Sequence, residues 1–305
     1  MMRLARKSLR RLMPDSSRTL ETILINQGRM LAIANAGREI KDIADAEFKV
    51  FSQWGEDGII QHLVSKIPGI SKTFIEFGVE DFGESNCRFL MMKDNWRGCI
   101  IDGSADNIAA IRATEYHWRY DLNAIEAFIT RDNIAELLDR SGFDKDCGIL
   151  SVDIDGVDYH VLEAAEAWRP AMLIVEYNAL FGDTACVTVP YDPSFIRQEK
   201  HYSNQYWGAS LGAFHHLASK RGYALVGVNS TGSNAFFVRR DMLWSPDAEL
   251  TVAQAFRPVT FRDARDETGQ LSYLSVAERR NLIADLPVLD VETGETKPIG
   301  SYFPK

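Results

Sequence analysis

The chain has no long apolar run and little cysteine. No stretch of its 305 residues approaches the roughly 18 consecutive apolar residues of a membrane-spanning helix, so we expect no integral membrane segment. The few cysteines form no CxxC pair and no zinc-ligand spacing. We therefore expect buried free thiols in a reducing compartment, at Cys87, Cys99, Cys147 and Cys186.

A basic excess is also missing. The net charge of −9 leaves no surplus of lysine and arginine to neutralise phosphates, so we expect no nucleic-acid partner. The exception is the N-terminal segment 1–13, in which five basic residues alternate with leucines. We expect a cytoplasmic protein whose N-terminus is either solvated or in peripheral contact with the inner face of a membrane.

From about Phe51 the apolar pattern alternates between strands and helices. Helical segments of about ten residues between strands are typical of βαβ units, and these predict a doubly wound, Rossmann-like and mostly parallel α/β sheet. The last two strands are close enough to pair antiparallel. The predicted strands are 73–79, 98–104, 118–122, 147–155, 171–178, 224–229 and 234–240.

The same pattern divides the chain into three parts. Residues 1–48 form an N-terminal helical region with a helix over about 16–45, residues 49–243 form the α/β domain, and residues 244–305 form an extension packed on it. Segment 179–206 is rich in Pro, Asp, Tyr and Gly and longer than a typical connection. Such a segment is predicted to be a substrate-covering loop.

Ligands of an open parallel sheet bind beyond the carboxyl ends of its strands. The first predicted strand ends in an acidic loop with a glycine, and the second ends in an acid suited to a ribose diol. Because the GxGxxG motif of NAD enzymes is missing, this pattern favours S-adenosylmethionine. We expect the cofactor to contact Glu76, Gly78, Asp102 and Ser104, and Asp121 after the third strand to accept the adenine amino group.

Acidic residues gather at the ends of the fourth and fifth strands. The fourth strand ends with Asp153 and Asp155, and the fifth ends with Glu176 and Asn178. Like charges at one edge are costly unless a cation or a substrate offsets them. Oxygen ligands suit Mg²⁺ or Mn²⁺, so one hypothesis is a metal held by Asp153, Glu176 and Asn178. The alternative is an acidic site that acts only by hydrogen bonds.

Within this acidic site we assign Asp153 to the side that faces cofactor or metal, and Asp155 as the base that takes a proton from the acceptor hydroxyl. His160 is a rival base, and Asp158 is expected to cap the next helix. Aromatic residues able to stack on a sugar or an adenine, or else to pack in the core, are Trp54, Tyr191, Tyr206 and Trp207.

An ordered series of segments between about Phe51 and Arg239 carries a family resemblance. The segments are SQWGEDGII, FIEFGVEDFGESNCRFL, GCIIDGS, ILSVDIDGVDYHVLEA, LIVEYN, VPYDPSF and GASLGAFHHLASKRGYALVGVNSTGSNAFFVR. The chain resembles the FkbM-like branch of class I S-adenosylmethionine-dependent methyltransferases, many of which belong to bacterial polysaccharide biosynthesis. The resemblance implies that Glu76 and Gly78 line the cofactor loop, Asp102 holds the ribose and Asp121 lies near the adenine.

The fourth and fifth strand ends are also similar to those of metal-dependent sugar O-methyltransferases, which show a DxDxxY segment and then two acids. Asp153, Asp155 and Tyr159 match the first segment, whereas the second has the single acid Glu176 followed by Tyr177 and Asn178. This departure leaves open whether the site binds a metal ion.

The resemblance implies an O-methyltransferase that acts on a sugar hydroxyl of a glycan or glycan precursor of the lipopolysaccharide or capsule type. One rival is a metal-dependent glycosyltransferase in which Asp153-Ile154-Asp155 is a DxD motif. A second rival is a noncatalytic scaffold of the same fold. Whether the protein forms a homo-oligomer stays open.

Overall fold

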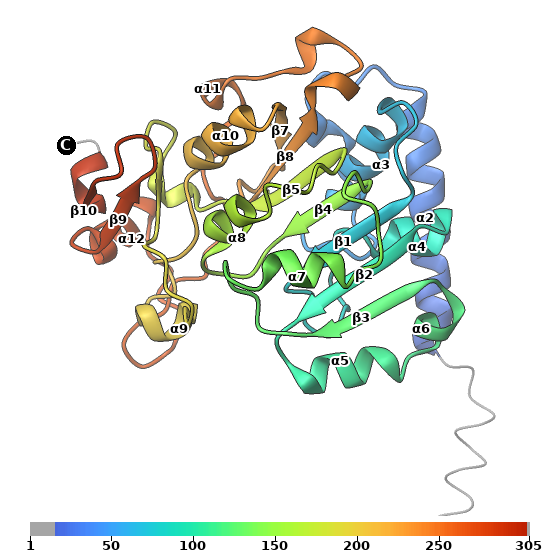
Figure 1. The fold of residues 1–305 in the computed structure, drawn as a ribbon, viewed down its shortest axis with the longest axis horizontal. Coiled ribbons are helices and arrows are strands. Elements are labelled where there is room, and N and C mark those ends of the chain that lie inside the picture. Colours follow the sequence, from blue (N-terminus) through green and yellow to red (C-terminus); the bar gives the residue numbers. More distant parts are fainter. Residues whose placement is uncertain (1–15, 304–305) are drawn as a thin grey trace, which may run out of the picture.

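A seven-stranded sheet with helices on both faces forms the centre of the protein (Figure 1). The computed structural model describes residues 16–303. The strands run in the order β3-β2-β1-β4-β5-β8-β7, with β8 antiparallel to both of its neighbours and the other pairs parallel. Their bounds are β1 Thr73–Phe77, β2 Arg97–Asp102, β3 Leu122–Glu126, β4 Ile149–Val152, β5 Met172–Glu176, β7 Tyr223–Val228 and β8 Asn234–Arg239.

The prediction of a doubly wound, mostly parallel sheet with a last antiparallel strand is therefore confirmed. The helices have the bounds α2 Ser16–Ala36, α3 Glu56–Lys66, α4 Arg88–Asp94, α5 Ala105–Arg112, α6 Glu115–Arg119, α7 Ile134–Asp139, α8 Asp158–Ala164, α9 Arg197–Lys200, α10 Leu211–Lys220, α11 Val252–Ala255 and α12 Val276–Ile283. Short 3₁₀ turns lie at η1 Ile43–Ala46, η2 Ala179–Phe181, η3 Arg240–Met242, η4 Pro246–Ala248 and η5 Ile299–Tyr302.

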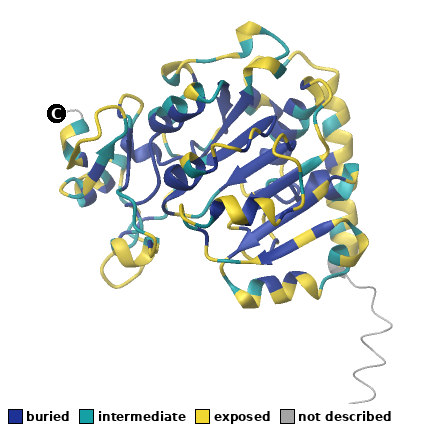
Figure 2. Ribbon diagram, viewed as in Figure 1, coloured by how far each residue is buried: buried dark blue, intermediate teal, exposed yellow. Residues whose placement is uncertain are grey.

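Successive side chains of each strand point to opposite faces of the sheet, so they form one apolar layer on each face. On one face, Ile75 and Ile101 belong to the cluster that includes α7, α8 and α10. On the other face, Phe74 and Ile100 pack with α3, α4 and α5. Figure 2 shows the central strands buried beneath these helices. The two layers fix the register, so the strand ends are held rigidly.

The carboxyl ends of the parallel strands meet at one edge of the sheet. β1 pairs with β2 on one side and with β4 on the other, and β5 lies next to β4. The chain order reverses at β1, which is the place where an open α/β sheet leaves a crevice for a ligand. Residues that directly follow β1, β2, β4 and β5 therefore face a common space.

Two predicted elements differ from the structure. The segment 118–122, predicted as the third strand, contains the end of helix α6 and the start of β3, which runs over Leu122–Glu126. The predicted helix 16–45 ends at Ala36, and η1 follows as a separate turn. Trp118 and Tyr120 provided the apolar residues that suggested a strand, but a helix of only five residues has no clear period to recognise.

The C-terminal part is joined to segment 179–206 through a second, three-stranded sheet. Strand β6 Val187–Thr188 pairs with β9 Pro287–Asp290, which in turn pairs with β10 Thr296–Pro298. Figure 1 shows this small sheet beyond the end of the main one. Segment 179–206 thus contains three short regular elements: η2, β6 and α9.

The four cysteines are free, and Cys186 alone among them is only half-buried. Within residues 16–303, no helix has the length and apolarity needed to cross a bilayer. The basic segment 1–13, for which we predicted membrane contact, lies outside the described residues.

Candidate active site

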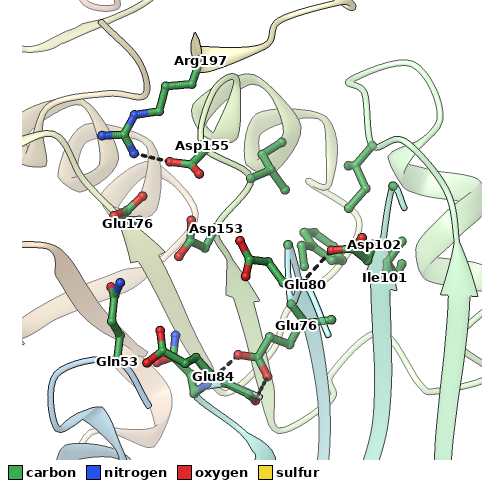
Figure 3. Close-up of a pocket in the computed structure, with 18 of the residues that line it drawn as sticks. Gln53, Glu76, Glu80, Glu84, Ile101, Asp102, Asp153, Asp155, Glu176 and Arg197 are labelled. Carbon is green, nitrogen blue, oxygen red and sulfur yellow. Dashed lines mark hydrogen bonds and ion pairs between the residues drawn. The ribbon is translucent and has the colours of Figure 1, made fainter. Parts of the chain in front are cut away.

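A cavity of about 800 Å³ opens at the carboxyl ends of β1, β2, β4 and β5. Figure 3 shows carboxylate side chains from these strand ends around one space. Further wall residues come from outside the strand ends: Gln53, Trp54, Phe195, Arg197, Phe261 and Arg262. The cavity therefore combines predicted strand-end residues with segments far away in the sequence.

Gly78 is required where the loop after β1 passes the loop after β4. Its φ is +66°, and a Cβ atom at this position would lie 1.7 Å from the carbonyl oxygen of Asp153. Only glycine combines this backbone conformation with so close an approach. Gly78 thus joins the cofactor side of the predicted site to its acidic side.

Glu76 lies on the cavity wall, but its carboxylate is engaged by the neighbouring loop. It accepts hydrogen bonds from the Ser85 hydroxyl at 2.6 Å and from the Asn86 N–H at 2.7 Å. Burial raises the pKa of Glu76 to about 7. The structure therefore assigns Glu76 an ordering role: it holds segment 80–86 against the strand ends.

Asp102 and Ser104 lie together at the end of β2, as predicted. Asp102 accepts hydrogen bonds from the N–H groups of Ser104 at 2.8 Å and Glu80 at 2.9 Å, and from the Asn107 amide at 3.1 Å. Ser104 caps α5 through the Asn107 N–H. Ser104 and Asn107 donate to Oδ1 and Glu80 donates to Oδ2, so the three donors fix the orientation of the carboxylate and leave a lone pair on Oδ2 for a ligand.

Asp121 lies at the opposite edge of the sheet, because it precedes β3 instead of following it. Its carboxylate is exposed and pairs with Arg97 at 2.5 Å. The sequence-based placement of Asp121 after the third strand is therefore wrong, and Asp121 does not line the cavity. The residues that do follow β3 and line it are Ala127, Phe128 and Ile129.

Three carboxylates meet at the ends of β4 and β5. Oxygen atoms of Asp153, Asp155 and Glu176 lie within 4.8 Å of one another. Burial and then the charges of Asp155 and Asp158 raise the pKa of Asp153 well above its ordinary value. Burial and the charge of Asp153 likewise raise the pKa of Glu176. Two carboxylates so placed do not both ionise easily, so the arrangement favours one proton shared between Asp153 and Glu176.

Arg197 is a cation of the site that no sequence pattern indicates. From the short helix α9 it pairs with Asp155, and at 2.7 Å with Asp263 in the C-terminal extension. Its guanidinium lies 4.5 Å from the centre of the Trp207 ring. In Figure 3 Arg197 reaches over Asp155 at the rim of the acidic cluster. Segment 179–206 is thereby tied directly to the acidic residues.

Asn178 does not join the acidic cluster. It is buried, its amide donates to the carbonyls of Gln205 at 3.1 Å and Trp207 at 3.0 Å, and its oxygen accepts from the Leu180 N–H at 3.1 Å. Through these bonds the Asn178 side chain holds both ends of segment 179–207 together. Asp155 is a third carboxylate beside Asp153 and Glu176, whereas both ends of the Asn178 amide are already hydrogen-bonded elsewhere.

His160 is buried in α8, and its Nε2 lies 2.9 Å from the carbonyl oxygen of Val189. Burial lowers its pKa, and it does not line the cavity. Asp158 is the first residue of α8 and not its N-cap, which is Val157. Its carboxylate accepts from the N–H groups of Ile154 at 2.7 Å and Gly156 at 2.9 Å, and so holds the loop that carries Asp153 and Asp155.

Of the aromatic candidates from the sequence, one lies in the cavity wall and three pack elsewhere. Trp54 lines the cavity, whereas Tyr206, Trp207 and Tyr191 do not. Trp207 packs beneath Arg197, and Tyr191 packs beside His160.

Comparisons with known proteins give only distant similarity. No protein-family model and no curated protein matches the chain. A crystal structure of the CurJ carbon methyltransferase is 11% identical with a TM-score of 0.39, covering 60% of this chain and 52% of that one. The magnesium protoporphyrin IX methyltransferase of Synechocystis PCC 6803 with bound SAM is 8% identical with a TM-score of 0.39, covering 60% and 77%.

A third solved structure, that of the pyocyanin biosynthetic protein PhzM, is 10% identical with a TM-score of 0.36 and covers 58% of this chain and 53% of that one. The chain thus spans about half the length of two of these three proteins. Identities and scores this low carry no argument about activity. The strand order and the antiparallel β8 confirm the predicted doubly wound, mostly parallel sheet.

Proposed function

We propose that the protein transfers a methyl group from S-adenosylmethionine to a hydroxyl of a sugar in a glycan or glycan precursor. The observation that carries this proposal is the meeting of two half-sites in one cavity: Gly78, Asp102 and Ser104 on one side, and Asp153 and Glu176 on the other. The sugar specificity rests on the resemblance of the sequence to FkbM-like enzymes.

The charge of the cavity suits this cofactor. Its wall has two arginines but eight acidic residues, which are Glu76, Glu80, Asp102, Glu84, Asp153, Asp155, Glu176 and Asp263. S-adenosylmethionine supplies an electrophilic methyl group on a positively charged sulfonium, and an acidic cavity attracts that charge. Asp102 would accept a ribose hydroxyl through the remaining lone pair of its Oδ2.

Deprotonation of the acceptor falls to the Asp153–Glu176 pair and not to Asp155. A base whose pKa is raised is a stronger proton acceptor, and burial raises the pKa of both members of the pair. Asp155 is exposed and paired with Arg197, so its charge is already offset. Its role in the proposal is to hold Arg197 and α9 over the acidic cluster.

Mg²⁺ or Mn²⁺ would be held by Asp153, Asp155 and Glu176, since all three donors are carboxylate oxygens. An ion there would acidify an acceptor hydroxyl and would compete with Arg197 for Asp155. The proposal predicts methyl transfer both with and without the ion, because the shared proton and Arg197 already reduce the charge repulsion.

Calorimetric titration of the protein with S-adenosylhomocysteine and with UDP, each with and without Mn²⁺, tests the proposal. We expect S-adenosylhomocysteine to bind and UDP not to bind, because the eight acidic residues of the wall outnumber its two arginines and repel a diphosphate. Binding of UDP with Mn²⁺ and none of S-adenosylhomocysteine would instead support a glycosyltransferase. S-adenosylhomocysteine binding without any methyl transfer would support the noncatalytic scaffold.

A further inference from the structure

The segment SQWGEDG was part of the family resemblance, and Trp54 within it was one of several aromatic candidates for stacking on a sugar or an adenine. We propose that its loop, Ser52–Asp57, and Phe261 of the C-terminal extension form the acceptor subsite, which binds the apolar C–H face of a neutral sugar ring. The proposal rests on the proposed methyl transfer and names the part of the cavity that selects the acceptor.

Asp57 gives the loop its shape from within. A single oxygen of its buried carboxylate accepts the backbone N–H groups of Val50 at 2.7 Å, Phe51 at 2.8 Å and Ser52 at 2.8 Å, together with the Ser52 hydroxyl at 2.8 Å. Four donors on one buried oxygen form a tight and directional turn. The backbone before Gln53 therefore has little freedom.

Glu56 fixes the other end of the loop. One of its oxygens accepts from the N–H groups of Trp54 at 2.9 Å and Gly55 at 3.0 Å. The other accepts from the amides of Asn229 at 2.7 Å and Asn234 at 2.9 Å. Since Asn234 begins β8 and Asn229 follows β7, the loop is fastened to the antiparallel end of the sheet. Two buried acids thus hold an exposed dipeptide, Gln53-Trp54, at the cavity wall.

Trp54 forms an aromatic platform with Phe261. The two rings are stacked, with their centres 5.2 Å apart and their planes 17° from parallel. Trp54 is still 37% exposed, so part of its ring surface remains open. Phe261 is held by its neighbour Asp263, which pairs with Arg197 at 2.7 Å and accepts from the Gln205 amide at 3.0 Å. The platform therefore depends on the C-terminal extension.

Gln53 supplies a free polar group beside the platform. Among residues 16–303 its side-chain amide has no hydrogen-bond partner, and it lines the cavity. Figure 3 shows Gln53 extending from its loop toward Glu176. Its donor and its acceptor are both available to sugar hydroxyls, on the same side of the cavity as the proposed proton acceptor.

The wall chemistry identifies the class of acceptor. A pyranose has apolar C–H faces, which pack on aromatic rings, and hydroxyl edges, which bond to amides and carboxylates. An anionic sugar would meet the excess of carboxylates at the cost of like-charge repulsion. The subsite therefore favours a neutral hexose over a uronic acid or a sugar phosphate.

Saturation-transfer NMR with neutral methyl hexopyranosides, and with methyl glucuronide as the anionic comparison, tests the subsite in the full-length protein. We expect contacts with one or more neutral hexosides and none with the glucuronide. Trp54→Ala and Phe261→Ala should each weaken hexoside binding by about tenfold. Trp54→Phe should largely restore it. The matched control is Trp118→Ala, because Trp118 is exposed on α6 and does not line the cavity.

S-adenosylhomocysteine affinity, measured on the same samples, separates the subsite from the proposed reaction. Unchanged affinity in Trp54→Ala with lost hexoside binding supports the subsite and shows that the variant is folded. Hexoside binding that survives both alanine variants, or wild-type protein that binds no hexoside, overturns the subsite. A third outcome is a wild-type protein that binds hexosides but no S-adenosylhomocysteine. If Trp54→Ala then loses hexoside binding, the subsite is supported and the proposed methyl transfer is rejected.

Discussion

The two sides of the cavity are built in different ways. The cofactor side consists of residues at and just after the ends of β1 and β2, and its hydrogen bonds join these two neighbouring strand ends, as do those of Asp102 with Ser104 and Glu80. The acceptor side joins the ends of β4 and β5 to segments from both ends of the chain, as in the contacts of Arg197 with Asp263 and of Trp54 with Phe261. A fold that keeps the first side fixed can therefore vary the second by changing loops and extensions.

Gly78 joins the two sides, and Gly78→Ala should have the largest effect on stability. The added Cβ atom would meet the Asp153 carbonyl oxygen at 1.7 Å in a left-handed backbone, so we expect a loss of about 3 kcal/mol or more in the free energy of unfolding. Chemical denaturation measures this loss. Gly142→Ala is the matched control, because its φ is +73° but nothing lies within 4 Å. Equal losses in the two variants would show that the contact between the sides is not tight.

Asp102→Asn should affect the cofactor side alone. Loss of a charged acceptor at the expected ribose site should weaken S-adenosylhomocysteine binding by about tenfold to a hundredfold. Calorimetry measures the affinity, and Asp121→Asn is the control. Because Asp121 is exposed at the far edge of the sheet, we expect a change within about twofold. A large loss in Asp121→Asn would restore the role first predicted for it.

Arg197→Gln should change the acceptor side by a smaller amount. The charge of Arg197 lowers the pKa of both Asp153 and Glu176, although burial keeps both raised overall. Removal of this charge should raise both pKa values further. Since the reaction needs an ionised base, the acidic limb of the pH profile of kcat/KM should move upward by about one pH unit.

Lys200→Gln is the control for Arg197→Gln, because Lys200 lies on the same helix but pairs with Asp192. It should leave the pH profile unchanged. If the acidic limb stays in place in Arg197→Gln, the base is not coupled to Arg197 and lies elsewhere.

What the sequence could predict follows the same division. Asp102, Asp153 and Glu176 were found because each ends an apolar run, and the sheet topology then brings strand ends together. Asp121 was misplaced because an error in one strand boundary moves a residue from one edge of the sheet to the other. Strand boundaries are the least certain part of such an assignment.

The residues that were missed or misassigned depend on long-range contacts. Arg197 meets Asp263 across 66 positions of the chain, a contact that no local spacing indicates. Asn178 follows a strand like a ligand, but its side chain bonds to a segment that passes over it nearly thirty positions later. Trp54 was one of several aromatic candidates, and its place in the cavity wall and its stacking on Phe261 distinguish it from the others.

Glu176→Gln tests the central claim, a cofactor side and a separate acceptor-activating side in one cavity, most directly. S-adenosylhomocysteine affinity and methyl transfer to a hexoside acceptor are measured side by side on wild-type and variant protein. We expect an affinity within about twofold of wild type and a loss of turnover of about a hundredfold or more, since one carboxylate of the proton-accepting Asp153–Glu176 pair is removed while the cofactor side is intact. Turnover close to wild type, or parallel loss of affinity and turnover, would contradict it.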